Sequence, residues 1–309
     1  MSAEPGIRIL ILAGPTGVGK TALALAIAER VGAEIIGADS VQIYRGLDIG
    51  SAKPTLEDRR RVRHHLIDVV SPDEPFSAGR YARLATAAIE DIVSRGKKPI
   101  VVGGSGLYIR ALLGGLVAGV EAAPAVRRPI AERLARNGIR DIRERLRKVD
   151  PVSAERIHAN DTYRMTRALE VYELTGKPLS EMHAGHGWPS GRFDARWIGL
   201  TEERPRLYAQ IEARCEEMIR QGFLEEVAAL EKAGYNLDLR PLQSLGYRQM
   251  GEVLRGHRSM EAALAEMKKE TRRYAKRQLT WFRSEKKTDW FCPSAGTRVI
   301  IERATGLLA

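Results

Sequence analysis

The chain has 309 residues, of which 44% are hydrophobic and 29% are charged, so it can bury a large core and is long enough for a main domain with an insertion. Lysine and arginine number 50 against 39 acidic residues, and the resulting net charge of +11 favours an acidic partner, nucleic acid first. The two cysteines lack the spacing of a zinc site or a disulfide framework, so we expect reduced thiols. No apolar run approaches the about 18 residues of a membrane span, and the start MSAEPGIR lacks the apolar core of a signal peptide. We therefore expect a cytoplasmic protein with no membrane partner.

The first third of the sequence alternates buried apolar runs with helical patterns. Strands are predicted at Ile7–Ala13, Glu34–Ala38 and Pro99–Gly103, and helices at Thr21–Arg30, Ala78–Arg95 and Leu107–Leu113. This alternation is typical of an α/β fold in which helices flank a parallel sheet, and it predicts a P-loop NTPase-like core.

The middle of the chain changes character. After a small-residue linker at Gly114–Pro124, the pattern is entirely helical and rich in arginine, with helices predicted at Ile130–Arg136, Ile139–Val149, Ser153–Ile157 and Thr162–Leu174 and a loop at Gly176–Arg192. We interpret residues 123–193 as an inserted all-helical domain, and residues 1–122 and 194–309 as the core. The core resumes with a strand at Asp194–Leu200, helices at Pro205–Leu230 and Met260–Phe282, and a short strand at Asp289–Cys292.

Residues 14–21 read GPTGVGKT and follow the first strand directly, which is the pattern of a phosphate-binding loop. Backbone N–H groups of such a loop form an anion nest, and the following helix contributes its positive dipole end. Lys20 is predicted to contact bridging phosphates, and the Thr21 hydroxyl to hold Mg²⁺. The predicted phosphate-binding residues are Gly14, Pro15, Thr16, Gly17, Val18, Gly19, Lys20 and Thr21. The pattern does not say which phosphate compound binds.

Two further polar residues follow predicted strands. Asp39 comes after the second strand and therefore lies at the same rim as the phosphate loop, where ligands of open α/β sheets bind. Four roles stay open for Asp39: a general base, a group that orients a nucleophile, a residue that holds Mg²⁺ through water, and a simple cap of the strand end. Ser105 lies in a second strand–glycine turn–helix sequence, GGSGLY, where its hydroxyl can donate to a phosphate or a base.

Two basic segments suit an acidic polymer. In NDTYRMTRALE (160–170), Arg164 and Arg167 fall on one helix face, which is either a solvated basic face or a phosphate contact. Residues 268–287 carry nine lysines and arginines around Tyr274, Trp281 and Phe282, a mixture that suits RNA but also suits a helix packed on the core by its apolar side.

His64 and His65 are neighbours in sequence without a cluster of further ligands. Adjacent residues of a strand point to opposite faces, so we favour a structural or hydrogen-bonding role over a metal site. His183 and His186 lie in the glycine-rich loop and give no clear signal.

Seven segments in order along nearly the whole chain resemble the tRNA dimethylallyltransferase family, also called tRNA isopentenyltransferases. They are GPTGVGKT, GADSVQIYRGLDIGSAKP (37–54), HHLID (64–68), GGSGLYI (103–109), NDTYRMTRALEVYELTGKPLS (160–180), QSLGYRQM (243–250) and TRRYAKRQLTWFR (271–283). The block at 37–54 is far more specific than the phosphate loop. Eukaryotic relatives carry a C-terminal zinc finger, and the absence of such a Cys/His cluster here resembles the bacterial type.

The resemblance implies transfer of a dimethylallyl group from dimethylallyl diphosphate to N6 of the adenosine immediately 3′ of the anticodon, with Mg²⁺ as cofactor, and we expect a monomer. Its catalytic residues would be Asp39 as the base, with Lys20, Ser105 and Arg214 on the diphosphate; Ser105 replaces the usual threonine. Gln210 stands where the family often has arginine and receives no role. The implied tRNA contacts, to the anticodon stem-loop, are Asp39, Ser40, Val41, Gln42, Ser105, Arg127, Tyr163, Arg164, Met165, Thr166, Arg167, Ser244, Leu245, Gly246, Tyr247, Arg248 and Gln249.

Three alternatives stay open at this point. A P-loop nucleotide kinase would use the same loop for ATP and consume it. An adenylate isopentenyltransferase would prenylate free AMP, although such relatives are shorter and lack the long RNA-binding portions. An RNA-binding NTPase switch would bind RNA without product, and it gives no reason for Asp39 and Ser105 to line the phosphate rim.

Overall fold

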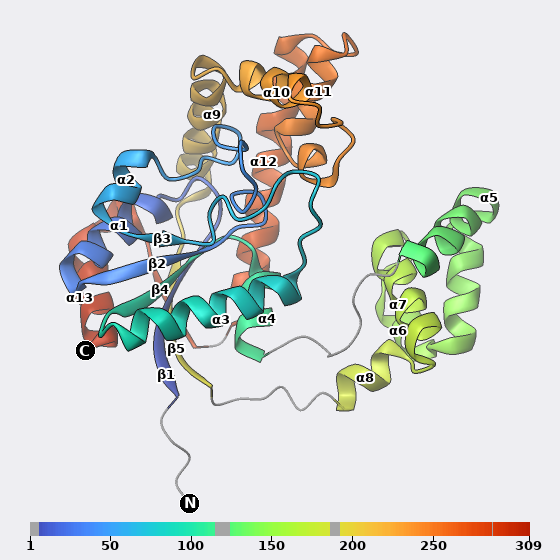
Figure 1. Ribbon diagram of the computed structural model, residues 1–309, viewed down its shortest axis with the longest axis horizontal. Coiled ribbons are helices and arrows are strands. Elements are labelled where there is room, and N and C mark those ends of the chain that lie inside the picture. Colours follow the sequence, from blue (N-terminus) through green and yellow to red (C-terminus); the bar gives the residue numbers. More distant parts are fainter. Residues whose placement is uncertain (1–5, 115–123, 186–191, 286) are drawn as a thin grey trace, which may run out of the picture. The chain divides into compact units, whose positions relative to one another are not determined.

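The structure, a computed structural model, describes residues 6–114, 124–185, 192–285 and 287–309. The chain forms two compact units, one made of Met1–Gly114 and Ser190–Ala309 and the other of Gly115–Pro189. Figure 1 shows that the first is an α/β unit and the second is helical. The domain boundary expected at residues 122 and 123 and most of the expected linker lie outside the described residues.

A six-stranded sheet forms the centre of the first unit. Its order is β3-β2-β4-β1-β5-β6 and every pairing is parallel, which confirms the predicted α/β class. The strands are β1 (Ile7–Ala13), β2 (Ala33–Ala38), β3 (His64–His65), β4 (Lys98–Gly103), β5 (Phe193–Leu200) and β6 (Thr288–Phe291). Only β3 was not predicted, because two residues are too few to produce an apolar run.

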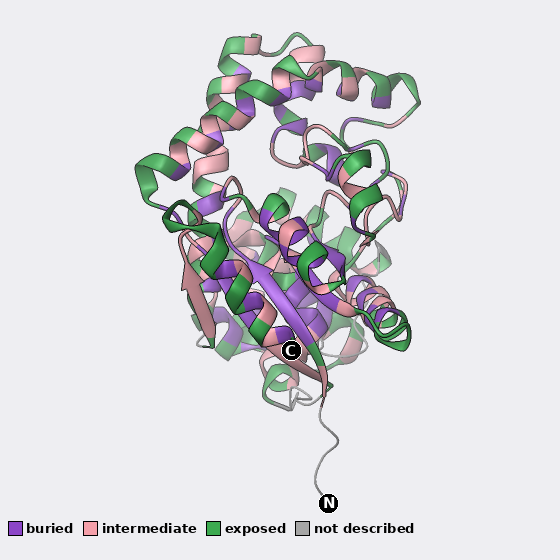
Figure 2. Ribbon diagram, turned by 90° about the vertical axis from the view of Figure 1, so that its left-hand side faces the viewer, coloured by how far each residue is buried: buried purple, intermediate pink, exposed green. Residues whose placement is uncertain are grey.

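Helices cover both faces of this sheet. Along β1, Leu10 and Leu12 belong to one hydrophobic cluster, whereas Ile9 and Ile11 belong to another, as the two-residue period of a strand requires. The first cluster includes side chains of α1 (Lys20–Val31) and α13 (Thr297–Leu308), and the second includes those of α3 (Ala78–Ser94) and α4 (Gly106–Gly114). Figure 2 shows the buried strands in the middle and the exposed outer sides of helices around them.

The C-terminal part of the first unit adds helices beside the sheet. They are α9 (Arg204–Arg220), α10 (Phe223–Lys232), α11 (Tyr247–Leu254), α12 (Met260–Phe282) and two short 3₁₀ helices at Arg240–Gln243 and Pro293–Ala295. Helix α2 (Leu56–Arg61) comes earlier in the chain, between β2 and β3. The boundaries predicted for α12 are confirmed. The single helix predicted over Pro205–Leu230 is wrong, because Gly222 at φ 94° ends α9 and begins α10.

The second unit has its own small core. Its helices are α5 (Pro124–Val149), which is interrupted at Gly138, α6 (Pro151–Arg156), α7 (Thr162–Thr175) and α8 (Leu179–Gly185). Ile142, Leu146, Met165 and Leu169 pack together at its centre. The loop predicted over Gly176–Arg192 is wrong in its first half, where α8 forms.

A buried carboxylate lies at the amino end of β2. The side chain of Glu34 is 3% exposed and pairs with both guanidinium nitrogens of Arg95, and its Oε2 lies 2.7 Å from His65 Nε2. His64 Nδ1 lies 2.7 Å from the carbonyl oxygen of Val62. Both histidines therefore serve hydrogen bonds within the fold, as their sequence context suggested.

We expect Glu34→Gln to lower the free energy of unfolding by about 2–3 kcal/mol, because a buried ion pair loses one charge. The hydrogen bond from Arg95 is the main cause that lowers the pKa of Glu34 to about 2. A carboxylate with a depressed folded pKa stabilises the protein above its unfolded pKa of about 4.3, and that contribution is lost as pH falls towards 2. In urea unfolding, the free energy of unfolding of Glu34→Gln should fall below that of the wild type by more at pH 7 than at pH 3. Glu29→Gln, which breaks an exposed pair with Arg61, is the control and should change little.

Candidate active site

Three neighbouring strands end level with one another at the carboxyl rim of the sheet. Gly103 at the end of β4 pairs with Ala13 of β1 on one side and with Ala38 of β2 on the other. The phosphate loop, Asp39 and the turn that contains Ser105 leave the sheet at this rim. The backbone N–H of Ser105 donates to Ala38 O at 3.1 Å, and the N–H of Ser40 donates to Ser105 Oγ at 3.1 Å, so these two turns are joined.

The phosphate loop leads directly into α1. Gly19 caps this helix without a side-chain hydrogen bond, which leaves the first N–H groups of the helix to other partners. Lys20 Nζ donates to the loop's own carbonyl oxygens, Gly14 O at 2.9 Å and Pro15 O at 2.8 Å. Burial, with a smaller effect from the charge of Arg214, lowers the pKa of Lys20 to about 7, while Asp39 acts in the opposite direction. An anion bound in the loop would raise the pKa of Lys20 again.

Helix α9 packs against the loop and brings Arg214 to it. A Cβ atom on Gly17, which has a φ of +84°, would lie 2.8 Å from Ile211 Cγ1, so the contact requires glycine. Arg214 follows Ile211 by three residues and is close enough to lower the pKa of Lys20. Burial lowers the pKa of Arg214 and the charge of Asp39 raises it. Lys20, Arg214 and Asp39 therefore form one electrostatic cluster contributed by three separate elements.

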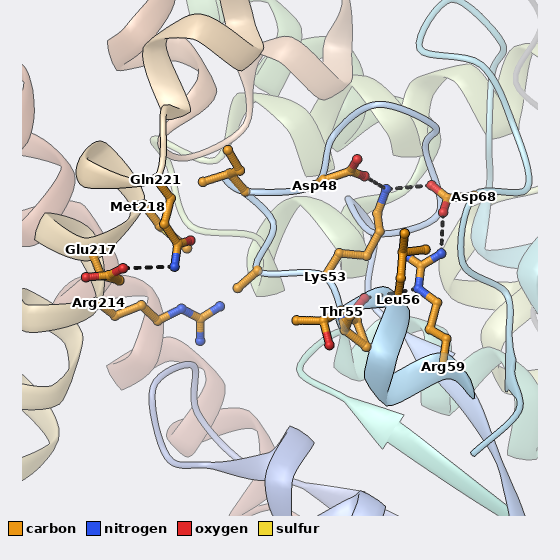
Figure 3. A pocket seen from close by; sticks show the side chains of 13 residues that line it. Asp48, Lys53, Thr55, Leu56, Arg59, Asp68, Arg214, Glu217, Met218 and Gln221 are labelled. Carbon is orange, nitrogen blue, oxygen red and sulfur yellow. Dashed lines mark hydrogen bonds and ion pairs between the residues drawn. The ribbon is translucent and has the colours of Figure 1, made fainter. Parts of the chain in front are cut away.

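A cavity of about 500 Å³ opens beside Arg214 (Figure 3). It is lined by Asp48, Ile49, Ala52, Lys53, Pro54, Thr55, Leu56, Arg59, Asp68, Arg214, Glu217, Met218 and Gln221. The other two cations are already neutralised: Lys53 bridges Asp48 and Asp68, and Arg59 lies 2.6 Å from Asp68. Within the described residues Arg214 has neither a hydrogen bond nor an ion pair, so it is the cation of this cavity that is left for an anionic ligand.

The far wall of the cavity is held by Glu226 of α10, a residue that the sequence did not reveal. Its carboxylate accepts the backbone N–H groups of Asp48 at 3.0 Å, Ile49 at 2.6 Å and Gly50 at 3.2 Å. The hydroxyl of Tyr247 donates to the same carboxylate at 2.7 Å. The DIGSAKP part of the sequence block at 37–54 thus builds and fixes a cavity wall. No local pattern could show a contact between residues 177 positions apart.

Asp39 has one occupied and one unoccupied oxygen. Its Oδ1 accepts the N–H groups of Val41 at 2.8 Å and Gln42 at 3.3 Å, which is the capping geometry that the sequence left open. Its Oδ2 has no hydrogen bond to any other described residue. Gln42 Nε2 donates to Ser51 O at 3.0 Å and Ala52 O at 3.1 Å, so it supports the cavity wall, and Ser40 is exposed.

The segment Ser244–Gln249, implied as a tRNA contact, is largely turned inward. Tyr247 and Gln249 are each 1% exposed, and Gln249 Oε1 accepts the N–H of Gly246. Their side chains stabilise the start of α11, and direct contact of these two with RNA is not supported. Leu245 is half-buried against the core, Ser244 Oγ donates to Pro241 O, and Arg248 is exposed.

The predicted contact residues of the second unit also differ in exposure. Arg127, Tyr163 and Arg164 are exposed, and Tyr163 is 63% exposed. Arg127 and Arg167 both pair with the buried Glu170. Met165 is completely buried in the core of the unit, and Thr166 Oγ1 donates to Thr162 O. A surface contact is therefore not supported for the Met165 side chain.

The basic face of α12 is mostly neutralised by neighbours. Its ion pairs are Lys268–Glu216, Lys269–Glu266, Arg272–Glu212 and Arg273–Glu270. Phe282 is buried, and Tyr274 and Leu279 are half-buried. Packing on the core therefore explains much of this segment, and its use as an RNA contact stays a prediction.

Candidate metal ligands are few. Among the described residues there is no group of three or more His, Cys, Asp and Glu side chains placed to hold a metal ion. Thr21 is exposed at the first turn of α1, and its hydroxyl has no hydrogen bond within the described chain. Separately, none of the helices in the described ranges is both long and apolar enough to cross a membrane.

Comparisons with known proteins agree with one another. The family model of IPP transferases matches residues 42–285. The chain is 47% identical to a tRNA dimethylallyltransferase 2 of Geotalea uraniireducens over 94% of both chains, and 50% identical to one of Syntrophus aciditrophicus over 93% of this chain and 92% of that one. Among solved structures, the tRNA isopentenylpyrophosphate transferase of Bacillus halodurans has a TM-score of 0.71 at 36% identity, covering 97% of this chain and 96% of that one. A eukaryotic dimethylallyltransferase acting on tRNA has a TM-score of 0.78 at 28% identity, covering 93% and 74%.

Proposed function

Because this chain belongs to the tRNA dimethylallyltransferase family, we propose that it transfers a dimethylallyl group from dimethylallyl diphosphate to N6 of the adenosine immediately 3′ of the anticodon and releases diphosphate. The observation that carries this proposal is the meeting of the phosphate loop, Lys20, Arg214 and Asp39 in one electrostatic cluster at the sheet rim. Cationic and N–H groups suit the leaving group, and a carboxylate suits the nucleophile.

The leaving group takes the electron pair of the allylic C–O bond. Negative charge then grows on the diphosphate, where the loop N–H groups, Lys20 and Arg214 stabilise it; one well-placed donor is worth about 3 kcal/mol. The cavity that Arg214 lines offers the donor room beside this residue. Ser105 adds a hydroxyl from the neighbouring turn.

The nucleophile is the exocyclic N6 of adenine, which is weak because its lone pair is shared with the ring. As the new N6–C bond forms, the nitrogen loses a proton, and we assign Asp39 Oδ2 as its acceptor. Oδ1 stays bonded to Val41 and Gln42, which fixes the direction of the carboxylate. The base must leave its stack to reach Asp39, which costs a few kcal/mol that the other tRNA contacts offset.

Mg²⁺ fits the residues present. The exposed Thr21 hydroxyl at the first turn of α1 is the protein group that would hold it, together with water and the oxygens of a bound diphosphate. When bound, the ion neutralises diphosphate charge. We further propose that the protein is a cytoplasmic monomer, and its two free cysteines, Cys215 and Cys292, support the cytoplasmic location.

We propose that the second unit binds the anticodon stem-loop through exposed residues such as Arg164, whose side chain is 73% exposed. Arg164→Glu should raise KM for tRNA about threefold to tenfold and reduce the slope of log affinity against log salt by about 1. Donor KM should not change. Arg30→Glu, at the last turn of α1, makes the same change of net charge and is the control. Equal salt slopes for the two variants would contradict this role.

The function is tested by incubating the protein with dimethylallyl diphosphate, Mg²⁺ and unmodified tRNA, followed by mass spectrometry of the nucleosides. We expect N6-dimethylallyladenosine at the position 3′ of the anticodon. Prenylation of AMP at the same rate as tRNA would favour an adenylate isopentenyltransferase. Consumption of labelled ATP without prenylated product would favour a kinase.

A further inference from the structure

Gln278 of α12 is a buried amide that joins the two glycine turns of the rim. Its side chain accepts the backbone N–H of Thr16, in the phosphate loop, at Oε1 (2.8 Å). Its Nε2 donates to the carbonyl oxygen of Gly104, in the Ser105 turn, at 3.0 Å. The residue is 6% exposed, so both bonds are sheltered from water.

The same face of α12 lies directly on the Ser105 turn. A Cβ atom on Gly104 would overlap the amide of Gln278, and one on Gly106 would overlap the ring of Trp281. Burial raises the pKa of Tyr274, and the side chains of Gln278 and Ser105 are close enough to act in the opposite direction. Tyr274, Gln278 and Trp281 are spaced by four and three residues, so they form one stripe of the helix.

An amide side chain suits this place for a simple chemical reason. One end of the group must accept a hydrogen bond and the other must donate one, and both protein partners are backbone groups without freedom to turn. Alanine would leave a buried N–H and a buried C=O unpaired. Glutamate would keep the bond from Thr16 but, when ionised, would present an oxygen to the carbonyl of Gly104.

We propose that Gln278 is a positioning residue that sets the spacing between the diphosphate in the phosphate loop and the adenine held at Asp39 and Ser105. This inference rests on the proposed function. Reacting atoms must be held about 3–3.5 Å apart, and a displacement of about 1 Å costs roughly 100-fold in rate. A side chain bonded to both turns acts on this distance without touching either substrate.

The test compares Gln278→Ala and Gln278→Glu with Ile300→Ala, a core truncation in α13 that lowers stability away from both turns. Each variant is assayed well below its melting temperature for kcat, for KM of tRNA and for the Kd of inorganic pyrophosphate. For Gln278→Ala we expect kcat to fall about 30-fold or more, while both binding constants change less than about threefold. For Gln278→Glu we expect the ratio of its kcat to that of the wild type to rise as pH falls from 8 to 6.5, because the protonated carboxyl again donates to Gly104.

Three results would overturn this role: a kcat for Gln278→Ala within threefold of the Ile300→Ala control, a loss of pyrophosphate affinity as large as the loss of kcat, or a pH-independent ratio for Gln278→Glu. The second result would show that the side chain serves the phosphate loop alone. Failure of the proposed function looks different, because the wild-type protein itself would then give no prenylated adenosine.

Discussion

Replacement of Asp39 by asparagine will lower kcat for tRNA prenylation by about 10³-fold and leave the affinity for dimethylallyl diphosphate within a fewfold of the wild type. General base catalysis contributes about 10² to 10⁴ in rate, and an amide cannot take the proton from N6. The structure makes asparagine the informative choice. Its amide oxygen can still accept the N–H groups of Val41 and Gln42, so the turn is preserved.

Asp39→Ala is the companion variant, since it removes both the proton acceptor and the cap of the turn. We expect the two variants to lose kcat to a similar extent, with alanine also less stable by about 1 kcal/mol. If the asparagine variant kept wild-type kcat and only alanine lost it, Asp39 would be a cap of its strand end and not the base. Single-turnover rates with saturating donor, read together with melting curves, separate these two outcomes.

Replacement of Lys20 by alanine will weaken donor binding and lower kcat/KM by about 10³-fold, because the Lys20 side chain stabilises the negative charge that grows on the diphosphate. The wild-type protein should also take up protons when diphosphate binds, and the variant should not. In the free protein the pKa of Lys20 is about 7, so at pH 8 the amine is mostly neutral. A bound diphosphate favours the charged amine, and binding at pH 8 should therefore take up close to one proton.

This uptake is measured by titration calorimetry with pyrophosphate in buffers of different ionisation enthalpy. The sign follows from the depressed pKa: uptake should be largest near pH 8 and should vanish below pH 6, where the amine is already charged. Lys97→Ala, at the opposite end of the sheet next to Glu34, retains the proton uptake and serves as the control. Equal uptake by Lys20→Ala would assign the proton to another group.

The parts of the site that the sequence predicted are those encoded over short distances. The phosphate loop, the strand before it and the helix after it form one continuous stretch, residues 7–31. The placement of Asp39 and Ser105 follows from the rule that parallel strands end at one rim. The bounds of α12 were predictable from its amphipathic pattern, which begins after Ser259 and continues to Phe282.

What the sequence could not show depends on contacts between distant segments. Glu226 and Gln278 look like ordinary polar residues of amphipathic helices until the fold places them against Ile49 and Thr16. Which side chains are buried also depends on contacts between distant segments. Met165 and Tyr247 belong to segments that resemble RNA contacts, yet tertiary packing turns these two side chains inward.

The cavity wall at residues 48–50 is held by the carboxylate of a distant helix and not by a neighbouring strand. Its amide hydrogens are therefore protected only while Glu226 and Tyr247 keep their places. Segments that share their protection in this way open together as one cooperative unit. We therefore expect hydrogen exchange of the amides of residues 48–50 to follow the local opening of α10 and α11, two helices that lie far along the chain from them.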